Sequence, residues 1–143
     1  MNTLEFSDID IERIAQSFEA AAISFKTDEE DSELYLTDGI DFPFWLKIDE
    51  KKKRIKFYTY LKAKDGTSPE NLKEFAHELN DQYVTVRFTI SVDEEDGRVY
   101  LFGDYFLYTG FGIIVPQLIH TAKKFAKIFI DAVREEDQGD VFF

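Results

Sequence analysis

The sequence offers few side chains that could bind a transition metal or act as a nucleophile. It has no cysteine, and its two histidines, His77 and His120, lie far apart in segments with helical spacing. A zinc site needs three or four converging nitrogen, sulfur or carboxylate ligands, which only dispersed acids could supply here. We therefore expect structural or surface roles for both histidines, with no metal and no cofactor.

Two runs of acidic residues, at 28–31 and 93–96, could offer oxygen ligands to a hard cation. Neither run has the alternating spacing with which a calcium-binding loop wraps its ion. Paired carboxylates can also act as acid and base, but only where their environments separate their pKa values. Clustered acids in turns give no sign of such burial, so we interpret both runs as solvated turns.

The remaining candidates for chemistry are glycines and serines. Gly103, Gly110 and Gly112 are too few and wrongly spaced for a phosphate-binding loop, and no Gly-Lys-Ser or Gly-Lys-Thr occurs. The serines lack the context of a nucleophile elbow and would have to recruit one of the two histidines. The sequence thus predicts a protein that is not an enzyme.

Charge and composition narrow the class of partner. The 143 residues include 29 acidic and 17 basic side chains, for a net charge of −12. This charge opposes binding to nucleic acid or to an anionic membrane, and it favours basic or amphipathic partners. We find no basic and apolar leader and no apolar run of about 18 residues, so we expect a cytoplasmic protein with no membrane partner.

The first element that must position any site is a helix near the N-terminus. Ser7 and Asp10 are spaced as in a capping box, which predicts a helix start there. Residues 27–32 are polar and acidic and predict a loop. Apolar residues between them recur at helical spacing over about four turns: Ile11, Ile14, Ala15, Phe18, Ala22 and Phe25.

Strands and a second helix follow. Residues 33–37, 42–49 and 54–62 show strand character, the last two with clear two-residue alternation. Pro43 has no N–H donor and belongs at a strand start or an edge. Ser68 followed by Pro69 predicts the cap and first turn of a helix that ends near Asp81.

The C-terminal half repeats the hairpin pattern and ends in a helix. Residues 84–92 give the cleanest alternation in the chain, and 98–108 form a second strand after a turn. Pro116 fits the opening turn of the longest apolar helix. Residues 135–143 predict a loose tail that can dock locally.

The predicted order is α-β-β-β-α-β-β-α, with no linker, repeat or low-complexity segment. Short turns between strands favour antiparallel pairing, and the interrupting helices must cover the sheet. We therefore expect one α+β domain over residues 1–143.

Several short segments accompany this element order: Leu36, Asp38 and Gly39 in the first strand region, Glu78-Leu79-Asn80 at the end of the second helix, Leu101-Phe102-Gly103-Asp104, and the last helix around Phe125. With these segments, the element order resembles the YbjN-like family of bacterial sensory-transduction regulators. The resemblance covers nearly the whole chain, but its motifs are diffuse apolar spacings. No functional residue can be carried over from it.

The fold of that family is similar to that of type III secretion chaperones, which are small, acidic, usually dimeric binding proteins. The resemblance therefore implies non-enzymatic protein binding. The element order, the acidic charge and the surplus of aromatic residues in the sheet together lead us to expect a homodimer. The chain departs from the family pattern at residues 111–116, where an apolar segment replaces a more polar approach to the last helix.

Aromatic side chains on the second face of the predicted sheet are the candidate interaction residues. The alternatives are that helices pack on both faces or that strand twist brings these side chains into one core. Otherwise a second subunit or a protein partner covers them. The candidates are Trp45, Tyr58, Tyr60, Tyr100, Phe102 and Phe106, with Tyr108 at the end of the same strand.

The leading hypothesis is a regulatory or chaperone-like protein-binding domain whose partner the sequence does not name. One alternative is a type III secretion chaperone that binds an extended effector segment. Another is a small-ligand binder or enzyme with a pocket between sheet and helices, for which no group of residues gives direct support.

Overall fold

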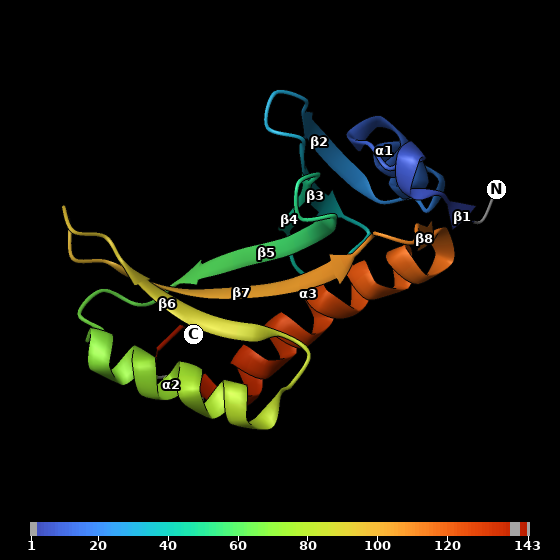
Figure 1. Ribbon diagram of the computed structural model, residues 1–143. Coiled ribbons are helices and arrows are strands. Elements are labelled where there is room, and N and C mark those ends of the chain that lie inside the picture. Colours follow the sequence, from blue (N-terminus) through green and yellow to red (C-terminus); the bar gives the residue numbers. More distant parts are fainter. Residues whose placement is uncertain (1–2, 138–140, 143) are drawn as a thin grey trace. The chain divides into compact units, whose positions relative to one another are not determined.

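The computed structural model describes residues 3–137 and 141–142 (Figure 1). These residues form two compact units. The first unit contains the described residues up to Phe57 together with Phe106–Lys127. The second contains Tyr58–Tyr105 and the described residues from Ile128 onward. Three elements, β5 (Arg54–Lys62), β7 (Val99–Tyr108) and α3 (Val115–Asp137), contribute residues to both units.

Six strands form an antiparallel sheet with the order β2 (Ser24–Asp28), β3 (Glu33–Asp38), β4 (Phe44–Asp49), β5, β7 and β6 (Arg87–Val92). Two further strands, β1 (Thr3–Leu4) and β8 (Ile113–Ile114), form a separate antiparallel pair. The prediction of an α+β fold with an antiparallel sheet and three helices is therefore confirmed. The single-domain organisation stays a prediction. In the part of the chain that the structure describes, no helix is both long and apolar enough to cross a membrane.

In the first unit, helix α1 (Ile11–Ala20) begins three residues later than the sequence predicts. Asp10, not Ser7, is the N-cap residue, and its carboxylate accepts a hydrogen bond from the backbone N–H of Arg13 at 2.8 Å. Ser7 lies in a short 3₁₀ helix, η1 (Phe6–Asp8). The proposed capping box was wrong because Asp is as good an N-cap residue as Ser.

The same helix ends earlier than its apolar spacing suggests. The N–H of Ala22 donates to the carbonyl of Glu19, and that of Ile23 donates to the carbonyl of Phe18. This is a Schellman ending, with Ala22 in the left-handed region at φ 60°. Phe25 consequently lies in a strand, β2 (Ser24–Asp28), where the sequence predicted a helix end and a loop.

The core of the first unit forms where aromatic rings from β4 (Phe44–Asp49), β5 and α3 meet. Phe44 packs edge-on against Phe57 and Phe125, with ring centroids 5.6 and 5.1 Å apart. Strand β3 (Glu33–Asp38) pairs with β4 and places Leu34 opposite Leu46. Alternate residues of β4 are thus buried, as their two-residue period predicts.

Residues 111–116, where the sequence departs from the family pattern, include a short strand. Ile113–Ile114 forms strand β8, which pairs with β1 (Thr3–Leu4). Gly112 lies so close to this pair that a Cβ there would be 2.5 Å from the carbonyl oxygen of Leu4. Neither two-residue strand was predicted, because two residues carry no periodicity.

In the second unit, helix α2 (Pro69–Gln82) begins where the sequence predicts. Ser68 is the N-cap residue and accepts a hydrogen bond from the N–H of Asn71. The next strand, β6 (Arg87–Val92), begins later than expected. Residues 84–86 precede it, and the Val84 side chain is exposed.

The core of the second unit depends on a close approach between β7 and α3. A Cβ placed on Gly103 would lie 2.5 Å from Cδ1 of Phe129, so only a glycine fits there without displacing the ring. Phe88, the register partner of Gly103, stacks on Phe129 with centroids 5.9 Å apart. This face of β6 and β7 is therefore closed by α3.

The C-terminal segment is more structured than predicted, since α3 continues to Asp137. The buried Asp137 carboxylate accepts hydrogen bonds from the N–H groups of Val141 and Phe142. The Val141 carbonyl accepts from the N–H of Lys64, and the Phe142 ring packs edge-on against Phe75. The rest of the proposed tail, residues 138–140 and 143, lies outside the described residues.

Replacing Gly103 with alanine should destabilise the protein by about 1–3 kcal/mol, because the added methyl group overpacks the site occupied by Phe129. Urea unfolding followed by circular dichroism measures this loss. Gly110→Ala is the matched control, since nothing lies within 4 Å of a Cβ at that position. Equal midpoints for the two variants would contradict the packing described here.

Candidate protein-interaction site

The two-residue period of β6 and β7 divides their side chains between two faces. Phe88 and Gly103 share the face closed by α3, as described above. The register places Thr89 opposite Phe102 and Ser91 opposite Tyr100, and these pairs lie on the other face. The sequence-based division of β7 into two faces therefore holds in the second unit.

Three of the predicted interaction residues come together on this face. Tyr60 of β5 meets Tyr100 edge-on, with ring centroids 5.8 Å apart and an interplanar angle of 84°. The Tyr60 and Phe102 rings are 5.3 Å apart at 36°. The Tyr60 residue is 42% exposed, while Tyr100 and Phe102 are half-buried. We call Tyr60, Tyr100 and Phe102 the aromatic patch.

The aromatic patch borders a shallow depression of about 320 Å³. Ser91 and Asp93 complete its lining, and neither residue was a sequence-based candidate. Alternation in β6 could have placed Ser91 on this face. Asp93 directly follows β6, in the acidic run that the sequence analysis assigned to a solvated turn. Its carboxylate accepts a hydrogen bond from the N–H of Glu95, as a turn role requires.

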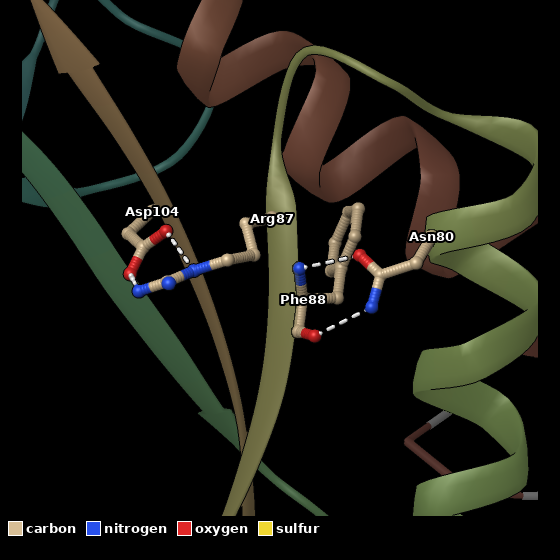
Figure 2. Close-up of polar contacts among 4 residues, drawn as sticks. All are labelled: Asn80, Arg87, Phe88 and Asp104. Atoms are coloured by element: carbon tan, nitrogen blue, oxygen red, sulfur yellow. Dashed lines mark hydrogen bonds and ion pairs between the residues drawn. The ribbon is translucent and has the colours of Figure 1, made fainter.

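An ion pair occupies the same side of β6 at its other end (Figure 2). Nε and Nη2 of Arg87 donate to the two carboxylate oxygens of Asp104 at 2.9 and 2.6 Å. Asp104 is buried, and its hydrogen bonds and charge raise the pKa of the Arg87 guanidinium above its ordinary value. The pair satisfies a carboxylate that would otherwise be buried without a partner.

Figure 2 also shows how α2 is joined to β6 on the side away from that pair. The side-chain amide of Asn80 accepts from the N–H of Phe88 at 2.8 Å and donates to its carbonyl at 2.7 Å. Asn80 thus replaces a neighbouring strand at this point of β6, which is the last strand in the sheet order. Sequence reasoning did not single out this role for Asn80.

The other predicted interaction residues do not join the aromatic patch. In the first unit, Trp45 stacks on Tyr35, with centroids 4.6 Å apart. Phe106, also in the first unit, lies under the Arg54 guanidinium at 4.3 Å. Tyr58 is half-buried on β5. Neither Tyr35 nor Arg54 was a sequence-based candidate.

In both acidic runs, aspartate side chains accept hydrogen bonds from nearby backbone N–H groups, as is typical of turns. Oδ1 of Asp28 accepts from the N–H of Asp31 at 3.2 Å, and Asp96 accepts from the N–H of Arg98 at 2.9 Å. Across residues 3–137 and 141–142, no three histidine, cysteine or acidic side chains gather as a metal site would require.

The family model that matches this chain is YbjN, described as "Putative bacterial sensory transduction regulator", and it covers residues 10–127. The chain belongs to the YbjN family. No curated protein matches the sequence significantly. The resemblance to this family that the sequence motifs indicated is therefore confirmed over residues 10–127.

Solved structures agree on the fold. YbjN from E. coli, described as "a putative transcription regulator", has a TM-score of 0.77 at 14% identity, covering 94% of this chain and 96% of its own. An uncharacterized protein from Methanothermobacter thermautotrophicus has a TM-score of 0.64 at 13% identity, and the match covers 91% of this chain and 98% of the other. A chain of the HopA1-SchA chaperone-effector complex has a TM-score of 0.56 at 12% identity, and the match covers 90% of this chain and 94% of the other. These likenesses confirm the expected chaperone-like fold.

A second polar contact links the end of α2 to α3 within the second unit. The Tyr83 hydroxyl donates to Oε2 of Glu135 at 2.5 Å. This hydrogen bond, with smaller contributions from burial and from the charge of Glu135, raises the pKa of Tyr83 from 10.0 to about 12. The folded state therefore favours the protonated phenol.

Because the folded pKa is the higher one, the contact stabilises the fold fully below pH 10, and this contribution is lost as pH rises to about 12. We expect Tyr83→Phe to reduce the loss of stability over that interval by about 1 kcal/mol, a value discounted for solvent screening. Urea unfolding at pH 9 to 12 tests this. Tyr108→Phe, at an exposed position, should keep the wild-type dependence of stability on pH. Identical plots of unfolding free energy against pH for all three proteins would contradict a raised pKa at Tyr83.

Proposed function

We propose that this YbjN-family protein is non-enzymatic and binds another protein through the aromatic patch, in a regulatory or chaperone-like role in the cytoplasm. The observation that carries the proposal is the grouping of Tyr60, Tyr100 and Phe102 around an open depression. Aromatic residues are enriched in the cores of interfaces, where they contribute large contact areas. The family and the chaperone-like fold support the same class of function.

Self-association is the second part of the proposal, and it concerns the first unit. Tyr108, Phe111 and Ile114 are all exposed there, within one short segment around β8. Exposed apolar side chains gathered in this way are typical of contact surfaces. In this proposal the homodimer forms through this segment of the first unit, and the partner binds to the aromatic patch of the second unit.

A dedicated secretion chaperone is the main alternative, since one similar structure is part of a chaperone-effector complex. Such a protein would bind an extended effector segment, and an effector gene beside its own would favour this alternative. A small-ligand binder is the other alternative. It would become the leading one if the protein proved to be a stable monomer without a protein partner.

Capture of partners from native lysate should depend on the aromatic patch. We expect Tyr60→Ser combined with Phe102→Ser to reduce recovery of a stoichiometric partner at least tenfold, which corresponds to about 1.4 kcal/mol. Mass spectrometry quantifies the recovery, and circular dichroism confirms the fold of each variant. Tyr108→Ser should retain the partner. Equal recovery by the patch variant would show that the partner binds elsewhere.

Self-association predicts a mass that rises from monomer to dimer with concentration in multi-angle light scattering. Phe111→Ser should weaken the dimer at least tenfold, because it removes an exposed apolar contact. Tyr60→Ser should leave the mass profile unchanged. A wild-type protein that stays monomeric at high concentration would contradict the dimer.

A further inference from the structure

The arrangement of the aromatic patch is specific enough to indicate the chemistry of its ligand. Tyr60 and Tyr100 meet at 84°, so their rings form two walls of a corner, and Phe102 adds a third ring 5.3 Å from Tyr60. Asp93 lines the same depression. Resting on the proposed protein-binding function, we propose that this depression binds the cationic side chain of an arginine or lysine presented by a partner protein.

Aromatic rings attract cations because the π faces carry partial negative charge. Several rings set at an angle to one another can contact a cation from more than one side, as in aromatic cages for ammonium groups. Here the cage is incomplete and open to solvent, which suits a side chain entering from a partner surface. The depression of about 320 Å³ has room for a guanidinium or ammonium group with its alkyl stem.

The charges around the patch favour a cation. Asp93 begins a run of four acids that extends through Asp96, and its Oδ1 accepts a hydrogen bond from the N–H of Glu95. A carboxylate can accept about four hydrogen bonds, so Asp93 can also accept from a guanidinium. The basic side chains two positions from Tyr60 and Tyr100 along the chain are matched by acids: Lys62 pairs with Asp65, and Arg98 pairs with Asp96.

The same charges argue against a second copy of this chain as the occupant. A second copy carries the same net charge of −12 and would bring further acidic surface to the acidic turn. A basic segment of a different protein would instead gain both Coulomb attraction and ring contacts. The chain itself contains such a contact in its first unit, where the Arg54 guanidinium lies 4.3 Å from the Phe106 ring centroid.

Titration of the ¹⁵N-labelled full-length protein with blocked amino acids tests the proposal by NMR. N-acetyl-arginine amide and N-acetyl-lysine amide should shift the resonances of the depression residues. N-acetyl-citrulline amide has nearly the shape of the arginine probe without its charge, and it should bind at least fivefold more weakly, in the range expected for a cation–π contact. Equal binding of the arginine and citrulline probes, or shifts confined to other regions, would overturn the proposal.

Conservative variants separate the aromatic and the acidic contributions. Tyr60→Leu and Phe102→Leu keep an apolar side chain but remove the ring, and Asp93→Asn removes the charge. Each should weaken binding of the arginine probe roughly fivefold. Phe6→Leu, which removes an exposed ring in the first unit, should leave it unchanged. Unchanged binding in all three patch variants would contradict the assigned site.

Two further outcomes separate this inference from the proposed function. A captured partner that binds wild type and the Asp93→Asn, Phe102→Leu double variant equally would reject cation recognition while the protein-binding role stands. Choline that binds at least tenfold more tightly than the arginine probe would also reject it, because the ligand would then be a small quaternary amine. Charge-dependent arginine binding with no recoverable partner would uphold the site chemistry and count against the proposed function alone.

Discussion

The contact between Phe129 and the bare backbone at Gly103 determines which face of β7 is buried in the second unit. No side chain fits between them, since a Cβ would lie 2.5 Å from the ring. Successive side chains of a strand point to opposite faces, so Phe102 and Asp104 must point away from α3. The position of one glycine thus decides that aromatic and charged residues of this strand are presented on the other face.

That other face is stable for different reasons at its two ends. Near Asp104, a bidentate ion pair with Arg87 compensates a buried carboxylate. Near Tyr100, the aromatic rings of Tyr60 and Tyr100 pack edge to face and remain partly exposed. A surface of this kind can bind a partner without refolding, because its side chains are already held by neighbours. Such pre-organisation reduces the entropy that association costs.

Much of the fold could be predicted because it depends on local patterns. Ser68 and Pro69 mark the start of α2 as expected, and the two-residue period identifies β4, β5 and β7. The errors have physical causes as well. The left-handed residue that ends α1 is an alanine, not the usual glycine, so no residue type marks the end of the helix and β2 was not predicted.

For the candidate site, the sequence predicts which side chains share a face of the sheet, but not which of them meet. Alternation shows that Tyr60, Tyr100 and Phe102 point the same way within their strands, but their grouping depends on which strands are neighbours. The roles of Asn80 and Asp93 depend on contacts between elements that no periodicity encodes. Trp45 and Phe106 share the alternation pattern, yet each has its own neighbour in the first unit.

Site-specific photo-crosslinking in cells, with p-benzoylphenylalanine in place of Tyr60, tests most directly whether a partner binds to the aromatic patch. Binding of a basic partner segment there predicts a crosslink from position 60 to an arginine- or lysine-containing segment of another protein, identified by mass spectrometry. The same probe at position 108 should give no such product. A folded protein whose position 60 crosslinks only to a second copy of the chain, or to no protein, would contradict the claim that the aromatic patch is the partner-binding surface.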